Sequence, residues 1–194
     1  MIIFVNVNKI QGNNTGQSIF HKITFVNWID IFTTLNHRYT LINSLKYYQQ
    51  YKGLEIFAYV LMPSHIHLIC SADKVKKLSD IMRDFKTFTS KQIIDNIINE
   101  PESRREWLLE LFRKACEHLQ RTQEFKVWQD GYHAEIIETP KFMYQKLNYI
   151  HNNPVADKIV EKPEDYLFSS ARNYADLDSE LDVFLLPTQL ITYN

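Results

Sequence analysis

Glycine is scarce in this sequence, which holds only four glycines among 194 residues, at positions 12, 16, 53 and 131. Their spacing matches neither the phosphate-binding P-loop nor the glycine fingerprint of dinucleotide-binding folds. We therefore expect no nucleotide cofactor. Any phosphoryl chemistry carried out by this chain would have to proceed without ATP.

Cysteine and long apolar runs are also lacking. The two cysteines, Cys70 and Cys116, are too few for a cysteine-rich zinc site and fit a protein of a reducing compartment. No apolar run approaches the roughly 18 residues needed to span a bilayer. The apolar start at residues 1–5 is too short for the core of a signal peptide. These features predict a cytoplasmic protein with no membrane partner.

Charge of one sign does not dominate the chain, whose net charge is −1. The charges are unevenly distributed, however, with seven acids and two bases in residues 161–194 against sixteen acids and twenty bases in residues 1–160. The acidic end is not expected to contact DNA phosphates. The basic segment 74–91 fits the solvated face of a helix as well as it fits a phosphate-contacting face.

Apolar residues make up 45% of the chain, which predicts a folded core. Residue patterns predict strands at Phe20–Trp28, Leu54–Leu61, Ile66–Cys70 and Tyr132–Glu138. They predict helices at Ile31–Tyr51, 76–98, Ser103–Leu119 and Pro140–Asn153. This order favours an α+β fold in which helices pack on a small antiparallel sheet. We expect an extension at 1–18, a main domain at 19–175 with a helical insertion at about 99–127, and an acidic tail at 176–194.

A His-x-His pair, His65 and His67, lies in one of the predicted strands. Alternate residues of a strand face the same way, so both imidazoles should project together while Ile66 and Leu68 face the core. Two neutral imidazoles supply half of a divalent-metal site. Two surface histidines that bind nothing would give the same pattern.

A polar stripe is predicted on the last long helix, where Gln145, Tyr149 and Asn153 follow one another at four-residue spacing. Such a stripe is not a core pattern, because buried polar groups need partners. In the alternative interpretation Tyr149 only packs its ring, as one of eleven tyrosines, and Asn153 ends the helix before Pro154.

Together the two segments suit one reaction, the attack of a tyrosine hydroxyl on a DNA phosphodiester. A divalent cation would polarise the phosphate, since phenol is a poor nucleophile at neutral pH. His65 and His67 would need a third ligand, for which Asn153 is the first choice and Gln145 the second. The expected cation is Mg²⁺ or Mn²⁺, with Mn²⁺ bound more tightly by imidazole.

The string YVLMPSHIHLIC resembles the histidine–hydrophobic–histidine (HUH) motif of single-tyrosine transposases. The string YIHNNPVADKIVEKPEDYLFSSARNY resembles the tyrosine segment and C-terminal signature of REP-associated tyrosine transposases, and IMRDFKTFTSKQI and VWQDGYHAEII resemble the segments between. The similarity covers about residues 20–174. It implies a ferredoxin-like domain that acts on single-stranded or hairpin DNA through a 5′-phosphotyrosine intermediate. By motif position it makes Tyr149 the nucleophile, His65 and His67 metal ligands, and Asn153 the third ligand.

Other activities remain open at this point. A replication-initiator-like nickase would share the metal and the tyrosine, and a host-retained DNA-binding protein could keep the fold without transposition. A homodimer is possible, and with it a site shared between two chains. The residues expected to contact DNA are Arg83, Lys86, Lys91, Arg104 and Arg105.

Overall fold

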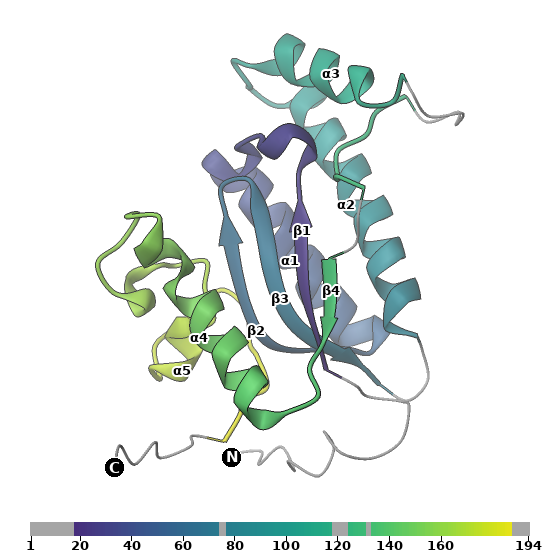
Figure 1. Ribbon diagram of the computed structural model, residues 1–194. Coiled ribbons are helices and arrows are strands. Elements are labelled where there is room, and N and C mark those ends of the chain that lie inside the picture. Colours follow the sequence, from purple (N-terminus) through teal and green to yellow (C-terminus); the bar gives the residue numbers. More distant parts are fainter. Residues whose placement is uncertain (1–17, 74–76, 118–123, 131–132, 188–194) are drawn as a thin grey trace.

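The computed structural model describes residues 18–73, 77–117, 124–130 and 133–187 (Figure 1). Nearly all of the predicted N-terminal extension therefore lies outside the described residues. The strands are β1 (Ile19–Thr24), β2 (Leu54–Met62), β3 (His65–Ala72) and β4 (His133–Ile136). The α-helices are α1 (Leu35–Lys52), α2 (Leu78–Asn99), α3 (Arg105–Lys114), α4 (Pro140–Ala156) and α5 (Ala171–Tyr174). Short 3₁₀ turns occupy Val26–Trp28, Ile31–Thr33 and Pro163–Asp165.

The four strands form one sheet in the order β2-β3-β1-β4, and every neighbouring pair is antiparallel. Pro63 and Ser64 form the tight turn between β2 and β3, so the proline stands at a hairpin turn rather than inside a strand. This order of strands and helices is the ferredoxin-like α+β arrangement, and the predicted fold class is confirmed.

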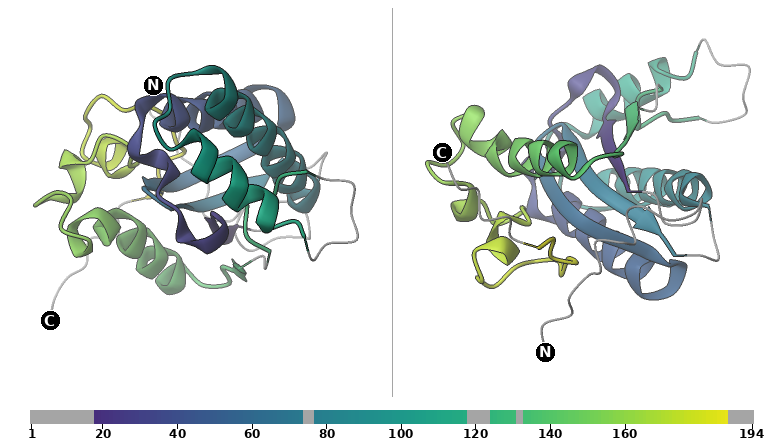
Figure 2. Two further views of the ribbon diagram at one scale, coloured as in Figure 1. Left: turned by 90° about the horizontal axis from the view of Figure 1, so that it is seen from above. Right: turned by 60° about the horizontal axis from the view of Figure 1, so that its bottom comes forward.

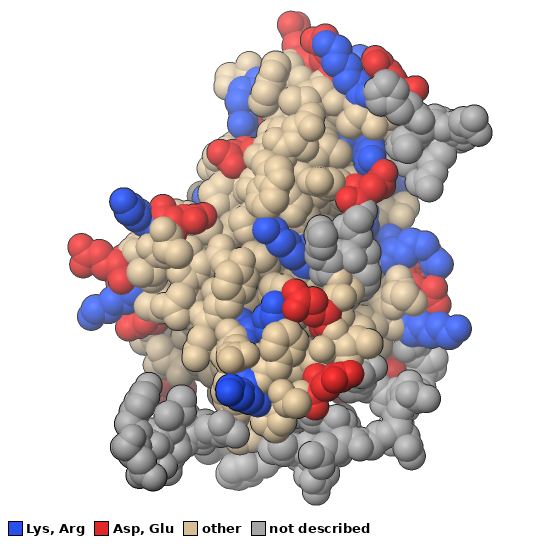
Figure 3. Space-filling view, in the orientation of Figure 1, with Lys and Arg blue, Asp and Glu red and all other residues tan. Residues whose placement is uncertain are grey.

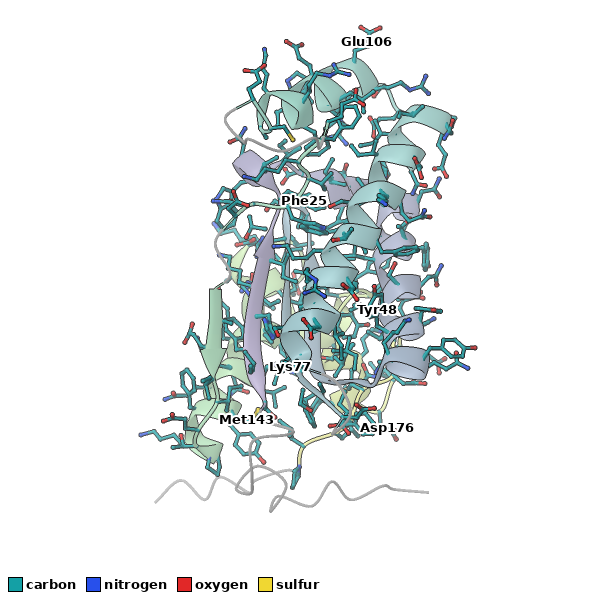
Figure 4. All side chains as sticks on the ribbon, turned by 90° about the vertical axis from the view of Figure 1, so that its right-hand side faces the viewer. Phe25, Tyr48, Lys77, Glu106, Met143 and Asp176 are labelled. Carbon is teal, nitrogen blue, oxygen red and sulfur yellow. The ribbon has the colours of Figure 1, made fainter. Side chains whose placement is uncertain are left out.

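Helices cover both faces of the sheet. In Figures 1 and 2, α1 and α2 lie together on one face while α4 lies on the other. The side view in Figure 4 shows Tyr48 of α1 on one side of the sheet and Met143 of α4 on the other. Both of these side chains are buried. Because strands alternate, each strand has one set of side chains under α1 and α2 and another under α4.

Several element boundaries differ from those predicted. The first strand ends at Thr24 rather than Trp28, because the chain turns at Val26–Trp28. The first long helix begins at Leu35 and ends where expected, with Gly53 as a left-handed cap at φ 73°. Helix α4 runs past Pro154 to Ala156, whereas we expected it to stop at Asn153. A proline in the last turn gives up one backbone hydrogen bond near an end that already has unpaired carbonyls, so the helix can continue.

The predicted helical insertion forms α3, whose Leu108 and Phe112 are buried. It lies beyond one end of the sheet, and Glu106 points away from the body (Figure 4). The helix is shorter than the predicted 103–119, since the chain leaves helical geometry after Lys114. Residues 118–123 lie outside the described residues.

The C-terminal segment packs along the outer edge of β2. Leu61 and Ser170 donate their N–H groups to the carbonyls of Phe168 and Tyr59, each at 2.9 Å, and Phe184 donates to Ile56 at 2.8 Å. These bonds use backbone groups that an edge strand would otherwise expose. Leu181 and Leu186 are buried, so part of the predicted tail belongs to the core.

We expected Tyr166, Leu167 and Phe168 to pack on the body. Tyr166 and Phe168 are buried, but the prediction for Leu167 was wrong, because its side chain remains 40% exposed. Asp176, Asp178 and Asp182 are exposed, in keeping with a solvated acidic surface. None of the helices in the described residues combines the length and the apolar character needed to cross a membrane.

Candidate active site and metal centre

Strand β3 places His65 and His67 side by side on the face of the sheet covered by α4. Their ring centroids are 4.7 Å apart and the ring planes nearly perpendicular. Ile66 and Leu68 face the other way and are fully buried. Since β3 lies between β1 and β2, both histidines belong to the interior of the sheet and are themselves buried.

Helix α4 brings Tyr149 to the same place. The helix begins with Thr139 as its cap, whose hydroxyl oxygen accepts a hydrogen bond from the Phe142 N–H at 3.2 Å, followed by Pro140 in the first turn. Met143, Leu147 and Ile150 fix the helix on the sheet by their buried side chains. The Tyr149 ring lies with its centroid 5.2 Å from that of His67, and the side chain is 47% exposed.

The structure distinguishes the two amides considered as a third ligand. The Asn153 side chain forms a hydrogen bond with His65 and is half-buried. Gln145 is exposed, and neither amide lines the cleft that contains His67 and Tyr149, so the contact with His65 is what sets Asn153 apart. Asn153 is thus the member of the stripe that meets the histidine pair, one helical turn beyond Tyr149.

Both histidines are neutral at physiological pH. Burial lowers the pKa of His65 to about 4, with a further lowering by Lys22 and an opposing effect of the Asn153 hydrogen bond. Burial lowers the pKa of His67 to about 2, and His65, Lys22 and Lys146 act in the same direction. A neutral imidazole keeps a lone pair on one nitrogen, which is the form that binds metals.

The hydrogen bonding of the two rings suits a metal as well. The Ser64 hydroxyl lies 3.1 Å from Nδ1 of His65, a contact that can fix the orientation of that ring. Neither ring nitrogen of His67 has a hydrogen-bond partner among the described residues, although the side chain is fully buried. Leaving a buried nitrogen unpaired is costly, so a ligand at this position would be stabilising.

A divalent cation therefore fits the residues present. Two neutral imidazoles and one amide oxygen leave coordination positions open for phosphate oxygen and water. Among the described residues no group of three or more His, Cys, Asp and Glu side chains could hold a metal, so a site here depends on the amide.

His67 and Tyr149 border a cleft of about 340 Å³. Its walls contain residues that we did not predict from the sequence, chief among them Phe20, Lys22, Trp28, Glu135 and Lys146. Their placement follows from pairing, since Lys22 of β1 lies opposite His67 and Phe20 opposite Glu135 of β4. The two-residue spacing of Phe20, Lys22 and Thr24 in a predicted strand could have suggested that these side chains share one face, but not that this face adjoins the histidines.

Three other tyrosines of the C-terminal half, which could compete with Tyr149 as the nucleophile, have their hydroxyl groups engaged. Tyr144 donates to the carbonyl of Pro187, Tyr166 to that of Leu61 at 2.7 Å, and Tyr174 to that of Phe57 at 3.0 Å. Tyr132, another tyrosine of this part of the chain, lies outside the described residues. Tyr149 has the hydroxyl that combines exposure with proximity to the histidine pair.

The five basic residues expected to contact DNA fall into two groups. Arg83, Lys86 and Lys91 of α2 line a groove of about 660 Å³ between that helix and residues 124–130. Arg104 donates to the carbonyl of Asp30 and pairs with Glu102, and Arg105 donates to the carbonyls of Ile97 and Glu100. The structure thus gives Arg104 and Arg105 a role in holding α3 in place. Figure 3 shows basic and acidic side chains interspersed over the visible face rather than a continuous basic surface.

Residues 19–112, which run from β1 through the histidine strand into α3, match the model of a protein family described as "Transposase IS200 like". This stretch, 94 of the 194 residues, is similar to that family. Helix α4, which carries Tyr149, lies beyond the matched residues. The family match therefore says nothing about Tyr149, whose place beside the histidines is seen in the structure alone. No curated protein matches the chain.

Two solved structures are similar to this chain. One is a REP-associated tyrosine transposase bound to a REP hairpin, 20% identical, with a TM-score of 0.54 over 94% of this chain and 92% of that chain. The other, from Deinococcus radiodurans R1, is described as a putative transposase; it is 15% identical over 73% of this chain and 93% of that chain, with a TM-score of 0.43. The first likeness supports the ferredoxin-like fold of this chain.

Proposed function

We propose that this protein is a transposase of the IS200-like kind that cleaves and rejoins single-stranded DNA, with the Tyr149 hydroxyl as nucleophile beside a divalent cation held by His65, His67 and Asn153. The observation that carries the proposal is the meeting of Tyr149 with His67, whose two ring nitrogens lack partners among the described residues, in one cleft.

In the cleavage step the Tyr149 oxygen forms a bond to phosphorus while the bond from phosphorus to the 3′ oxygen breaks. The phenol proton goes to water, since the side chain is half exposed, and the departing 3′ oxygen takes up a proton. The 5′ phosphate stays on Tyr149. Attack by a 3′ hydroxyl on this phosphotyrosine restores the diester, so rejoining needs no ATP.

A bound Mg²⁺ or Mn²⁺ would polarise the phosphate and offset its developing charge. The chain's own groups do the rest of the positioning. Burial keeps His65 and His67 neutral and oriented, while the α4 cap and buried face keep Tyr149 and Asn153 one turn apart over them. Lys22 and Lys146, which border the cleft, provide positive charge for a phosphate.

All four residues come from one chain, so the proposal needs no second copy to complete the site. A DNA hairpin or a single strand is the proposed substrate. Support for this comes from the family and from the similar transposase, which is bound to a REP hairpin.

The experiment that tests the proposal uses a single-stranded oligonucleotide carrying the DNA that flanks the gene, labelled at one end, with Mn²⁺ or Mg²⁺. With a 3′ label, the radioactivity should move to the protein on a denaturing gel. With a 5′ label, it should appear in a free, shortened fragment. A free 3′-labelled fragment without protein attached would indicate hydrolysis by water, and no cleavage of flanking or hairpin DNA under any metal would refute the proposal.

A further inference from the structure

Trp28 is exposed at the rim of the cleft, and its own backbone holds it there. The residue ends the turn Val26–Trp28, in which Val26 is buried while the Trp28 side chain is 51% exposed. Asn27 and Trp28 have φ values of 54° and 56°. Asparagine adopts the left-handed region more readily than most side chains, but this backbone conformation is unfavourable for a bulky residue such as Trp28. This backbone conformation leaves the large indole of Trp28 exposed to solvent, whereas the hydrophobic effect would favour its burial.

The indole lies between two hollows. On one side it borders the cleft with His67 and Tyr149, and its ring centroid is 5.4 Å from that of His65. It also borders a second hollow of about 480 Å³, together with Leu111, Lys114 and Lys126. A strand of nucleic acid that leaves the cleft in this direction would have to pass Trp28.

Lys22 lies directly against this indole, with Nζ 4.3 Å from the ring centroid. Within the described part of the chain Lys22 makes no ion pair, whereas Lys146 pairs with Glu135 at 2.9 Å and Lys126 with Asp130 at 2.5 Å. The ammonium of Lys22 is thus a charge in the cleft that no described carboxylate pairs with directly, although Asp130 and Glu135 line the same cleft. It also lies near both histidines, since it is among the causes that lower their pKa values.

An exposed aromatic face next to an ammonium matches the two parts of a nucleotide. Every base has a face that can stack on an indole, and each base is linked to a phosphate that a lysine can bind. A paired base inside a duplex is already stacked on its neighbours, so an unpaired base gains most from the indole. A second copy of this chain or another protein would match the indole alone, but would not explain an unpaired ammonium facing a cleft with His67 and Tyr149.

We propose that Trp28 and Lys22 form a subsite for one unpaired nucleotide next to the phosphate that Tyr149 attacks, with the base on the indole and its phosphate on the ammonium. This inference rests on the proposed function, because it assumes that DNA enters the cleft. It adds a specificity element: the enzyme requires a free base at a fixed distance from the cleaved bond.

The test is a binding measurement on a Tyr149→Phe background without divalent metal, so that no chemistry takes place. The probe is a fluorescein-labelled single-stranded oligonucleotide from the flanking DNA, followed by anisotropy. Single abasic sites are placed at each position in turn. We expect one position at which loss of the base weakens binding about 10-fold, in line with the stacking of one base.

Adding Trp28→Ala should weaken binding of the intact oligonucleotide by a similar factor. In this variant an abasic site at the same position should cause no further loss of affinity. Trp28→Phe should lie between, which also covers the case in which the alanine variant folds poorly. Trp107→Ala is the matched control, because Trp107 is also 51% exposed but lies on α3 and borders neither hollow. Lys22→Gln should lower the slope of log affinity against log salt by about one, as expected for one lost phosphate contact.

The failures of the two proposals can be told apart. If the abasic scan and Trp28→Ala behave as expected but the Tyr149 enzyme forms no adduct with DNA, the subsite stands and the proposed chemistry fails. If the enzyme cleaves DNA but no position is sensitive in the scan, or Trp28→Ala binds like its parent, the subsite is refuted.

Discussion

The ring of Tyr149 stands edge-on to the ring of His67, with 5.2 Å between centroids and 79° between the ring planes. One residue comes from an interior strand of the sheet and the other from the helix that covers it. Eighty-two positions separate them in sequence. A tyrosine that only packed its ring would not need to lie over a buried histidine whose nitrogens have no described partner.

Metal binding should depend on Asn153 and not on Gln145. Titration calorimetry with Mn²⁺ should give a lower Kd than with Mg²⁺, and Asn153→Ala should weaken Mn²⁺ binding about 10- to 100-fold because it removes an oxygen ligand. Gln145→Ala is the matched control on the same helix and should bind like the wild type. Equal Mn²⁺ affinity in the two variants would exclude Asn153 as a ligand.

Mn²⁺ should also raise the melting temperature through His67. A cation at a hundred times its Kd adds about 2.7 kcal/mol to the free energy of unfolding if it binds only the folded chain. In His67→Ala this increase should be lost, while the melting temperature without metal falls little, because the removed ring has two unpaired nitrogens. An undiminished Mn²⁺ effect in His67→Ala would place the cation elsewhere.

Stability should fall in mild acid, in part through His21, which lies on the opposite face of the sheet from the cleft. Burial lowers the pKa of His21 to about 4. The unfolded chain takes up a proton near pH 6.5, so the stabilisation is complete above that pH and is lost as pH falls toward 4. The loss amounts to about 3 kcal/mol at 1.36 kcal/mol per pKa unit. Urea unfolding of wild type and His21→Gln should be measured at pH 7 and 4.5. The free energy of unfolding should fall less in the variant than in the wild type; an equal fall in both would show that His21 does not cause the loss.

Replacing Lys91 should weaken DNA binding, whereas replacing Arg105 should lower the stability of the fold. Lys91→Gln should weaken DNA binding and lower the salt slope by about one, because Lys91 lines the open groove on α2. Arg105→Gln should instead cost about 1.5–3 kcal/mol of stability, through its bonds to the carbonyls of Ile97 and Glu100. If Arg105→Gln keeps its stability and loses DNA affinity, Arg105 contacts DNA as we first expected.

The acidic C-terminal surface should not contribute to DNA binding. Changing Asp176, Asp178 and Asp182 together to Asn should leave DNA affinity unchanged or raise it, because these exposed carboxylates repel phosphates. Deletion of residues 176–194 is a poorer test, since it also removes the buried Leu181 and Leu186. A drop in affinity for the triple Asn variant would mean that this surface binds DNA or supports a residue that does.

Local patterns in the sequence were enough to predict several features of the site. The two-residue period of a strand places His65 and His67 on one face, and Thr139-Pro140 predicts where the tyrosine helix begins. These predictions depend only on neighbours along the chain. The same holds for the helix ending at Gly53, where the left-handed cap suits a residue without Cβ.

Features that depend on strand pairing could not be predicted in this way. The register that sets Lys22 opposite His67 is a property of two strands about 45 residues apart, and nothing in either segment specifies it. The turn at Trp28 was predicted as strand, because Val26 and Trp28 favour strands and neither Asn27 nor Trp28 is a glycine. Arg104 and Arg105 looked like a basic surface. The Asp30 carbonyl that Arg104 binds comes from a distant part of the chain, and the Ile97 and Glu100 carbonyls reach Arg105 only because the chain turns between α2 and α3.

The central claim is that the Tyr149 oxygen becomes the covalent link to DNA. The most direct measurement is the yield of protein–DNA adduct on a denaturing gel, from 3′-labelled single-stranded flanking DNA and Mn²⁺, for wild type, Tyr149→Phe and Tyr144→Phe. Tyr144 is the control because it lies on the same helix but donates its hydroxyl to the carbonyl of Pro187. We predict adduct for wild type and Tyr144→Phe and none for Tyr149→Phe, with folding and DNA affinity kept in all three. Undiminished adduct in Tyr149→Phe would contradict the account.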